Sequence, residues 1–483
     1  MNRRMVLNLI GKIILVEAVL MLLPLTVSII YQDSSTMSFV VSIAIAVVLG
    51  TVLTLISNPS NQVIYAKEGF VIVALVWLAL SAIGALPFYI SGEIPKYIDA
   101  FFETVSGFTT TGASILPDVT KMSKGILFWR SFTHWVGGMG VLVFVMAIIP
   151  KASDRPMHLL RAEVPGPIVG KLVPKMKDTA KILYLIYIAL TLLEMVILIC
   201  GGMPIFDSIV HSFGTAGTGG FGIRADSIGS YAPHLQWTIA IFMLMFALNF
   251  NLYYLALIRR FRSVILSKEL WTFLLIVGFS ITVITIDIYP RFSSFEESLR
   301  HATFQTSSII STTGYTSADY GEWSTLSKSI LLILMFIGGC AGSTAGGLKV
   351  SRIMLLGKMI KREFKRMLHP RSVGVIKFNG KKVDNSTLTG VSNYLAIYVL
   401  LFVLIFFSLC LFNSNFNIET NLSAAASCFN NIGPGLDKVG PSYSFAEYSN
   451  ISKFILSISM LLGRLEIYPI LIALSPSTWA KKY

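Results

Sequence analysis

Long apolar runs recur along this chain, and they constrain its fold more than any other feature of the sequence. A bilayer core is crossed by about 20 consecutive apolar residues in an α-helix, and Val6 to Tyr31 is the first run of that length. Only 13% of the 483 residues are charged, whereas soluble domains carry about 25%. The sequence therefore predicts an all-α polytopic membrane protein, with lipid as its main surroundings.

Ten spans are expected, at 6–31, 37–56, 69–91, 125–149, 179–200, 235–258, 270–290, 325–348, 390–413 and 450–474. The first run lacks a small-residue cleavage site, so we interpret it as a retained helix rather than a signal peptide. The net charge of +14 concentrates in three loops, Lys151–Lys181, Arg259–Lys268 and Lys349–Lys382. Positive loops stay in the cytoplasm, which places both termini there in a bacterial inner membrane. The same rule explains the basic loops better than nucleic-acid binding, and no nucleic acid partner is expected.

An internal repeat follows the first two spans. A span, a short amphipathic segment, a loop rich in small polar residues and a second span occur four times in this order. The short segments are Ile98–Phe108, Phe206–Phe213, Phe295–Phe304 and Ile418–Phe429. Each has an acid at its second position, which suits the positive end of a helix dipole, and each is too short to cross a bilayer. They are predicted to be re-entrant half-helices.

The repeat divides the chain into five predicted units. An N-terminal two-helix domain occupies 1–66, and pore repeats follow at 67–177, 178–267, 268–385 and 386–483. The second helix of the third repeat is expected to be broken.

The loops after the half-helices can be aligned on Gly112, Gly219, Gly314 and Gly433. The candidate filter residues are Thr110, Thr111, Gly112, Ala113; Gly217, Thr218, Gly219, Gly220; Thr312, Thr313, Gly314, Tyr315; and Asn431, Ile432, Gly433, Pro434. Small residues also permit close helix packing, but that explains one such loop and not four in matching places.

Non-helical backbone at membrane depth is tolerated where it lines a watery cavity. Loops that turn rings of carbonyl oxygens toward one axis replace the hydration shell of K⁺, as Thr-Val-Gly-Tyr-Gly does in potassium channels. The third loop, Thr-Thr-Gly-Tyr-Thr, is close to that string. K⁺ is therefore the expected bound and transported ion. The acids Asp118, Asp226, Asp319 and Asp437 follow the loops and either form an acidic outer vestibule or cap their own loops.

Two further features lie on the cytoplasmic side of the predicted filter. Five glycines fall within Gly338–Gly347, and each disfavours a helix by about 1 kcal/mol relative to alanine, so a mobile loop is expected there. Arg464 lies in an apolar span, where a charge is costly and by default functional; it either faces the pore or pairs with a distant carboxylate. Lys349 is either a gate residue or a boundary residue that snorkels. The predicted gate consists of Gly338, Gly339, Gly342, Ser343, Thr344, Gly346, Gly347, Lys349 and Arg464.

These loops, the run Gly338–Gly347 and the motifs Trp129–Gly140, Asn249–Asn251 and Gly463–Glu466 closely resemble the TrkH branch of the TrkH/TrkG/KtrB potassium-uptake superfamily. The resemblance covers essentially the whole chain. The additional helix pair at 6–56 favours TrkH over KtrB.

The resemblance implies four M1–P–M2 units around a pseudo-fourfold pore, after a two-helix domain. It further implies a homodimer that passes K⁺, and often Rb⁺, under control of a cytosolic TrkA-like ring. It assigns Gly338–Gly347 to the gating loop and Arg464 to the gate arginine. The chain has no Gly-x-x-x-x-Gly-Lys-[Ser/Thr] loop, so nucleotide is expected to act only through the partner, with no organic cofactor. Lys349–Lys382 and Lys151–Lys181 are the expected docking faces, either for that partner or for anionic lipid.

A gated, channel-like uptake subunit is the leading hypothesis, and an H⁺- or Na⁺-coupled K⁺ symporter is the alternative. Coupling to protons requires titratable groups in the spans, and few are present: Glu17, Glu194 and Glu466. An enzyme is not expected, because no nucleophile–base or metal-ligand pattern occurs. Arg130 and His134 are expected at the membrane interface, with no role in transport.

Overall fold

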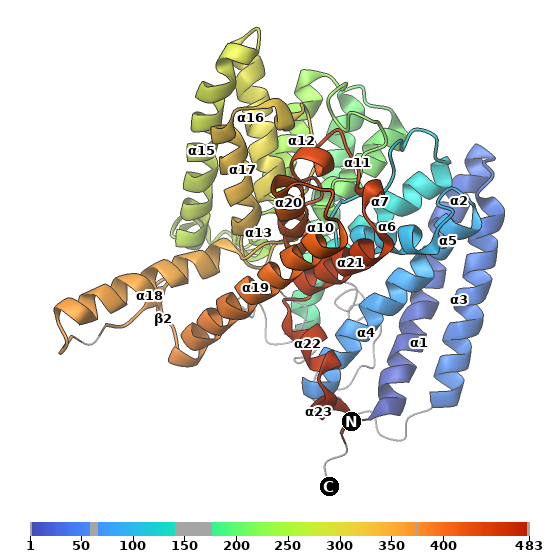
Figure 1. Ribbon diagram of the computed structural model, residues 1–483, viewed down its shortest axis with the longest axis horizontal. Helices are drawn as coiled ribbons and strands as arrows, with labels where there is room; N and C mark the ends of the chain where they lie inside the picture. Colours follow the sequence, from blue (N-terminus) through green and yellow to red (C-terminus); the bar gives the residue numbers. More distant parts are fainter. Residues whose placement is uncertain (1, 58–65, 141–175, 373, 481–483) are drawn as a thin grey trace.

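The computed structural model describes residues 2–57, 66–140, 176–372 and 374–480, and it is built almost wholly of helices (Figure 1). The helices are α1 Arg3–Leu20, α2 Leu22–Tyr31, α3 Thr36–Ser57, α4 Ala66–Gly84, α5 Leu86–Ile90, α6 Tyr97–Phe108, α7 Lys124–Gly138, α10 Met176–Cys200, α11 Ile205–Gly217, α12 Pro233–Phe246, α13 Phe250–Leu257, α14 Phe261–Ile265, α15 Lys268–Ile288, α16 Phe295–Ile310, α17 Thr325–Ile337, α18 Val350–Leu368, α19 Asn385–Phe412, α20 Ile418–Asn430, α21 Asn450–Arg464, α22 Tyr468–Leu474 and α23 Pro476–Trp479. Short 3₁₀ turns lie at Tyr289–Arg291, Tyr320–Glu322, Asp437–Val439 and Phe445–Glu447, and a small hairpin pairs β1 Lys377–Phe378 with β2 Lys381–Lys382.

Six apolar segments of the described chain are long enough to cross a membrane as helices. They are Arg3–Tyr31, Thr36–Ser57, Lys67–Ile90, Lys181–Cys200, Lys268–Arg291 and Asn385–Phe412. Each coincides with a span predicted from the sequence, so the prediction of an all-α polytopic membrane protein is confirmed.

The first two spans, α1–α2 and α3, stand as an antiparallel pair at one side of the molecule (Figure 1). They pack closely because glycines face each other: a Cβ added to Gly11 would lie 2.8 Å from Gly50 O. Van der Waals packing through small residues is the main attraction between helices in lipid. The pair also packs on α4, which begins the next unit.

The second helices of the predicted repeats are more broken than the sequence suggests. A break is expected only within 325–348, and there α17 ends at Ile337. The spans at 235–258 and 450–474 are wrong as continuous helices, because α12 and α13 meet at 91° and α21 ends at Arg464 before α22 begins. For 125–149, α7 ends at Gly138, and residues 141–149 lie outside the described part of the chain.

Two of these breaks satisfy each other's backbone. The Cys340 N–H donates to Ala247 O at 2.9 Å, and the Phe250 N–H donates to Gly342 O at 3.0 Å. The Asn249 side chain caps α13 by accepting from Asn251 N at 2.9 Å. Broken helices persist at membrane depth only when neighbouring groups replace the lost hydrogen bonds. The partner of the break after α12 therefore lies far along the sequence.

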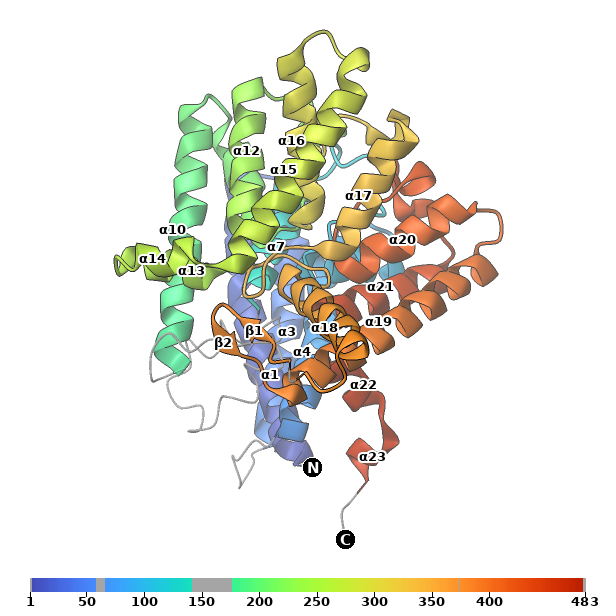
Figure 2. The ribbon, with the colours of Figure 1, turned by 90° about the vertical axis from the view of Figure 1, so that its left-hand side faces the viewer.

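Four short helices, α6, α11, α16 and α20, follow the first helices of the predicted repeats, and most of their residues are buried (Figures 1 and 2). They match the half-helices expected from the sequence. Asn417 caps α20 by accepting from Thr420 N at 2.8 Å, and Ser294 caps α16 by accepting from Glu297 N at 3.2 Å. Capping satisfies N–H groups that would otherwise be unpaired at a helix start. The four C-termini lead directly into the predicted filter loops.

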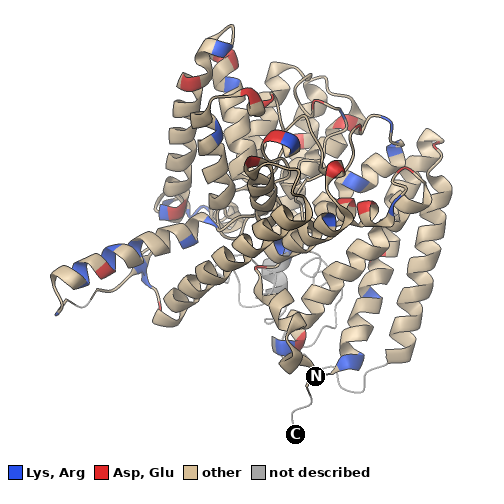
Figure 3. Ribbon diagram, in the orientation of Figure 1, with Lys and Arg blue, Asp and Glu red and all other residues tan. Residues whose placement is uncertain are grey.

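Helix α18 and the β1–β2 hairpin project from the body beside the first part of α19 (Figure 1). Lys and Arg residues occur along the length of α18 (Figure 3). These elements hold most of the basic segment Lys349–Lys382. The other predicted docking face, Lys151–Lys181, lies almost wholly outside the described residues.

Candidate ion pathway

The four predicted filter loops share one backbone conformation, which corrects their alignment. We call residues 110–113 loop 1, 217–220 loop 2, 312–315 loop 3 and 431–434 loop 4. Each contains a left-handed residue and, two positions later, a glycine of positive φ. The pairs are Thr110 (φ 55°) and Gly112 (81°), Thr218 (55°) and Gly220 (74°), Thr312 (58°) and Gly314 (85°), and Asn431 (57°) and Gly433 (109°). The alignment of Gly219 with Gly112 is therefore wrong by one residue, and Gly220 is the equivalent position.

The four loops contact one another in a closed ring. A Cβ added to Gly112 would overlap Gly219 O in loop 2, and one on Gly220 would overlap Thr313 O in loop 3. In the same way Gly314 faces Ile432 O in loop 4, and Gly433 faces Thr111 O in loop 1 at 2.8 Å from its ideal Cβ. Each glycine thus lets its loop approach the carbonyl at the equivalent position of the next. The segments that the sequence pattern singled out meet around one centre.

Hydrogen bonds beyond the glycines fasten neighbouring loops together. The Ile228 N–H after loop 2 donates to Thr316 O after loop 3 at 2.9 Å. The Tyr320 hydroxyl after loop 3 donates to Gly435 O after loop 4 at 2.9 Å. The Phe445 N–H beyond loop 4 donates to Ser114 O after loop 1 at 2.9 Å. These bonds hold the ring from its outer side.

The remaining predicted residues come directly after the glycines. Ala113 and Pro434 line an open cavity, whereas Tyr315 is buried and its hydroxyl donates to His211 O in α11 at 3.2 Å. The aromatic residue of loop 3 therefore braces the neighbouring pore helix. Thr111 and Thr313 are also buried, and their hydroxyls pair with those of Thr109 and Ser311.

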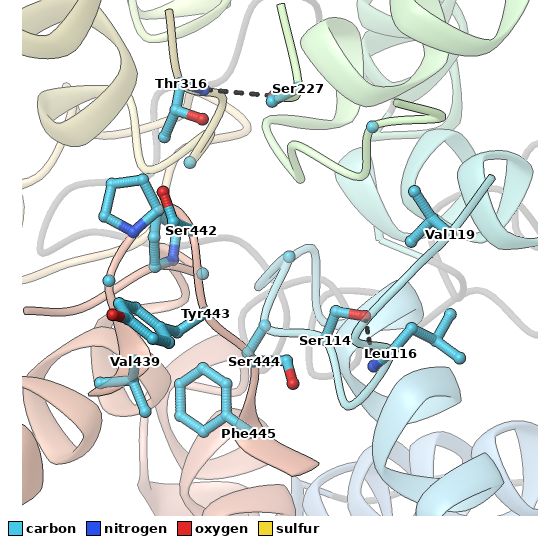
Figure 4. A pocket seen from close by; sticks show the side chains of 18 of the residues that line it. Ser114, Leu116, Val119, Ser227, Thr316, Val439, Ser442, Tyr443, Ser444 and Phe445 are labelled. Atoms are coloured by element: carbon cyan, nitrogen blue, oxygen red, sulfur yellow. Dashed lines mark hydrogen bonds between the residues drawn. The ribbon is translucent and has the colours of Figure 1, made fainter. Parts of the chain in front are cut away.

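One cavity of about 540 Å³ opens above the ring, and Gly112, Gly220, Gly314 and Gly433 all line it. Figure 4 shows its wall, with Ser114, Leu116 and Val119 on one side, Ser227 and Thr316 on another, and Val439 to Phe445 on a third. The Thr316 N–H donates to Ser227 Oγ across this wall at 3.3 Å. The four loops thus form the floor of a single outer vestibule.

The vestibule is not lined by all four of the acids that one of the two sequence interpretations placed there. Of these four, Asp437 alone is among the lining residues, together with Glu447 and the basic Arg130, Arg224 and Lys438. Asp118 accepts from Thr120 N at 3.0 Å, and Asp319 from Gly321 N at 2.8 Å. The alternative of local capping in the external loops describes these side chains better.

Arg130 and His134, which were expected at the membrane interface, lie instead behind the filter loops. Arg130 is 3% exposed and His134 0%. The Arg130 guanidinium donates to Glu103 of α6 at 2.6 Å and to Gly222 O, just after loop 2, at 2.9 Å. Glu103 also accepts from Ser114 Oγ at 2.9 Å. The expectation that Arg130 and His134 sit in the aromatic belt is wrong, because their partners come from pore segments far along the chain.

Below the ring, the segment Gly338–Lys349, here called the glycine segment, passes under loops 3 and 4. The Gly346 N–H donates to Thr312 Oγ1 in loop 3 at 2.6 Å. A Cβ on Gly346 would overlap Asn430 O, at the end of α20 just before loop 4. Gly338, Gly342 and Gly347 have φ of 70°, 70° and 75°, a region that suits glycine. The expected interruption of the third repeat is therefore present, and it contacts loop 3 and the residue before loop 4 on the side of the ring away from the vestibule.

Other predicted gate residues hold the glycine segment in place. The Thr344 hydroxyl donates to Phe246 O at the end of α12 at 3.1 Å, and the Ser343 hydroxyl donates to Cys340 O at 2.7 Å. A Cβ on Gly339 would lie 3.0 Å from Ala247 O, so this glycine permits close approach to the break after α12.

Arg464, at the end of α21, joins the glycine segment to a third element. Its guanidinium donates to Thr344 O at 2.8 Å, and to Gly137 O and Gly138 O at the end of α7 at 2.6 and 2.7 Å. Charge-assisted hydrogen bonds of this kind are about twice as strong as neutral ones. Arg464 therefore fastens the glycine segment to the end of α7.

Two further charged groups support this layer. Lys349 is 1% exposed and donates to Ala345 O within its own segment, so it does not snorkel to water. Glu466 pairs with Arg352 of α18. Glu466 lies only two residues after Arg464, but its carboxylate pairs with Arg352, and Arg464 donates to carbonyl oxygens instead.

Known proteins resemble this chain over nearly its whole length. A family model described as TrkH, cation transport protein, matches residues 35–483. The chain belongs to the TrkH family. The Trk system potassium uptake protein TrkH of Salmonella typhimurium is 36% identical over 488 residues, which cover 99% of this chain and 100% of that protein. TrkG of Escherichia coli is 32% identical, covering 99% of this chain and 98% of that protein.

A crystal structure of the potassium transporter TrkH from Vibrio parahaemolyticus superposes with a TM-score of 0.88 at 33% sequence identity, covering 99% of this chain and 100% of that chain. TrkH proteins form a cation transport family and not an enzyme family. This chain is accordingly a multi-pass membrane protein and a transport subunit of the Trk type.

Proposed function

We propose that this TrkH-family protein conducts K⁺ selectively into the cell through the ring formed by loops 1 to 4. The closed ring of glycine-to-carbonyl contacts is the observation that carries this proposal. It brings equivalent carbonyls, of Thr111, Gly219, Thr313 and Ile432, together from four segments of one chain. Backbone oxygens in such a ring replace the water around a potassium ion.

The chemistry of the surrounding helices supports a cation over an anion. The C-termini of α6, α11, α16 and α20 lead into the ring, and a helix C-terminus carries roughly half a negative elementary charge. The named relatives are potassium uptake proteins. K⁺ is therefore the proposed cargo, with no organic cofactor.

The glycine segment is proposed as the gate, and Arg464 as the residue that keeps it closed. It touches loop 3 through Thr312 and is bound to α7 through Arg464. Because the cation must pass this layer after the ring, a positive guanidinium there adds an electrostatic barrier. Release of Arg464 from Thr344 O would free the segment to move.

Control from the cytoplasm is proposed through a TrkA-like nucleotide-binding ring, and assembly as a homodimer in a bacterial inner membrane. The basic length of α18 offers a docking face that continues from the glycine segment through Val350. Movement of α18 by a partner would therefore pull directly on the proposed gate.

Purified protein in liposomes tests conduction. We expect K⁺ flux that follows the membrane potential and persists without a Na⁺ or pH gradient. Replacing Gly314 with Ser should lower the K⁺/Na⁺ flux ratio about tenfold, because a side chain at φ 85° would overlap Ile432 O. Flux that requires a Na⁺ or proton gradient would support the symporter instead, and an unchanged ratio in Gly314→Ser would remove loop 3 from the filter.

A further inference from the structure

Loop 2 lacks the side chains that brace the other loops. In loop 1, Thr109 Oγ1 and Thr111 Oγ1 lie 2.8 Å apart on either side of Thr110. In loop 3, Ser311 Oγ and Thr313 Oγ1 lie 2.7 Å apart on either side of Thr312. These hydroxyl pairs are buried behind the backbone that forms the ring.

The equivalent positions in loop 2, on either side of Thr218, are Gly217 and Gly219. Neither glycine has a positive φ, so the backbone itself does not require glycine there. In loop 4 the matching positions are the larger Asn430 and Ile432. Loop 2 alone therefore has no side chain of its own behind the ring.

An imidazole from another part of the chain fills this place. A Cβ on Gly219 would overlap the ring of His134, whereas a Cβ on Gly217 would overlap the backbone carbonyl of His134. His134 belongs to α7 of the preceding repeat and is completely buried. Gly219 thus makes room for a side chain that arrives from α7, and Gly217 permits the close approach of the α7 backbone.

The hydrogen bonds of His134 span two loops and fix its tautomer. Gly107 O, near the end of α6, can only accept, so Nδ1 donates to it at 2.7 Å. The Phe221 N–H after loop 2 can only donate, so Nε2 accepts from it at 3.3 Å. The His134 and Phe221 rings also pack against each other at a tilt, with centroids 4.2 Å apart. His134 thus links the pore helix that feeds loop 1 to the backbone of loop 2.

Arg130, one helical turn before His134 in α7, also connects the segments that follow loops 1 and 2; we call this connection the joint between the loops. Its guanidinium lies 3.5 Å from the centre of the Phe221 ring and donates to Gly222 O. Glu103, its ion partner, accepts from the Ile115 N–H after loop 1 at 3.0 Å. A buried ion pair is costly unless its remaining donors and acceptors are satisfied, and here they are used to hold the two loops.

We propose that His134 is a positioning residue for ion selectivity, acting as the missing side chain of loop 2, with the Glu103–Arg130 pair securing the joint between loops 1 and 2. This inference rests on the proposed filter. Coordination by rings of carbonyls requires each oxygen to keep its place. Without the imidazole, the Gly219 carbonyl loses the support behind it and the ring admits ions of other sizes.

Removing the side chain at position 134 and adding one at position 219, singly and together, tests the proposal. Gly219→Thr alone, which overlaps the imidazole, and His134→Ala alone, which empties the place, should each lower the K⁺/Na⁺ flux ratio in liposomes about fivefold or more, on the scale of a lost buried hydrogen bond. The double variant moves the side chain from α7 into loop 2 and should recover the ratio to within about twofold of the unmodified protein. Such recovery is the signature of coupled sites.

A conservative variant separates positioning from folding. His134→Gln keeps one amide donor for Gly107 O and one acceptor for the Phe221 N–H, so it should retain most of the ratio. His234, which is exposed and bonds to Gly201 O at 2.9 Å, provides the matched control; His234→Ala should leave the ratio unchanged. Elution as a single species in detergent confirms that each variant is folded.

An unchanged ratio in folded His134→Ala would overturn the positioning role. If the K⁺/Na⁺ flux ratio of the double variant is no better than that of the worse single variant, the imidazole and a side chain at position 219 do not substitute for each other. That result would overturn the proposal that His134 acts as the missing side chain of loop 2. Absence of K⁺ preference in the unmodified protein would instead overturn the proposed function, and the selectivity role with it.

Discussion

The proposed pore of this protein has two levels that differ in kind. At the outer level, loops 1 to 4 repeat the same pair of backbone conformations and contact one another in a closed ring. At the inner level, the helices α7, α12, α17 and α21 end in different ways, with a turn after Gly138, a 91° bend, the glycine segment and the residues Leu465 to Ile467. One level is regular, and the other is not.

This difference follows from what each level has to do. A desolvated cation needs oxygens on every side, so each loop must present its carbonyl in the same way. Closing a pathway needs only one obstruction, so a single repeat can carry the glycine segment while another supplies Arg464. Loop 2 shows that even the regular level requires only equivalent backbone, because its buried side chain comes from α7.

The strongest way to break the outer level is a side chain at a ring glycine. Gly220→Ala should reduce K⁺ flux about 100-fold, because left-handed strain of about 1–3 kcal/mol is added to an overlap with Thr313 O. Gly92→Ala is a matched control, since Gly92 has φ 76° with nothing within 4 Å of its ideal Cβ. Tracer uptake into liposomes measures both. Equal losses in the two variants would assign the effect to backbone strain and not to the ring.

The inner level is tested by removing Arg464, whose hydrogen bonds hold the glycine segment to α7. Arg464→Ala should raise basal K⁺ flux about tenfold, because the variant loses charge-assisted hydrogen bonds worth about 1.5–3 kcal/mol each. Arg291, exposed in the turn after α15, offers a control arginine whose replacement by alanine should change nothing. Flux without the regulatory ring is the quantity to compare. A fall in basal flux would show that Arg464 supports the open state and not the closed one.

The smallest effect is expected from charge at the mouth of the pore. Asp437→Asn should raise the K⁺ concentration at half-maximal flux about twofold through lost electrostatic attraction, whereas Asp118→Asn should not, because Asp118 does not line the vestibule. The Thr420 hydroxyl holds the pKa of Asp437 below its usual value. Since that carboxylate loses its charge only when the pH falls through this lowered pKa, its contribution should be constant from about pH 5 to pH 8. A marked change within that range would point to another group.

The sequence was sufficient for whatever is local and repeated. The six continuous spans, the four half-helices and the broken third repeat follow from runs of apolar residues, acids at helix starts and the glycines of 338–347. The alignment of loop 2 failed because Gly219 and Gly220 are indistinguishable as letters. Their roles are set by His134 and Thr313, which approach from other repeats.

Predictions that depended on distant partners failed for the same physical reason. The bend after α12 is stabilised by hydrogen bonds to Cys340 and Gly342, and the sequence around Ala247 does not reveal these distant partners. Arg130 and His134 were placed at the interface by their position within α7, but burial against Glu103 and Gly107 decides where they lie. A histidine and an arginine on an apolar helix, together with a loop whose expected hydroxyls are replaced by glycines, is the signal that could have revealed them.

The mutual bonding of the two helix breaks has a consequence for how the gate opens. If the glycine segment moves away, Ala247 O and the Phe250 N–H lose their partners at membrane depth. Unpaired backbone groups there cost several kcal/mol each, and water is the substitute at hand. Opening is then also a wetting transition, in which solvent enters as the segment leaves, so osmolytes that withdraw water should favour the shut state.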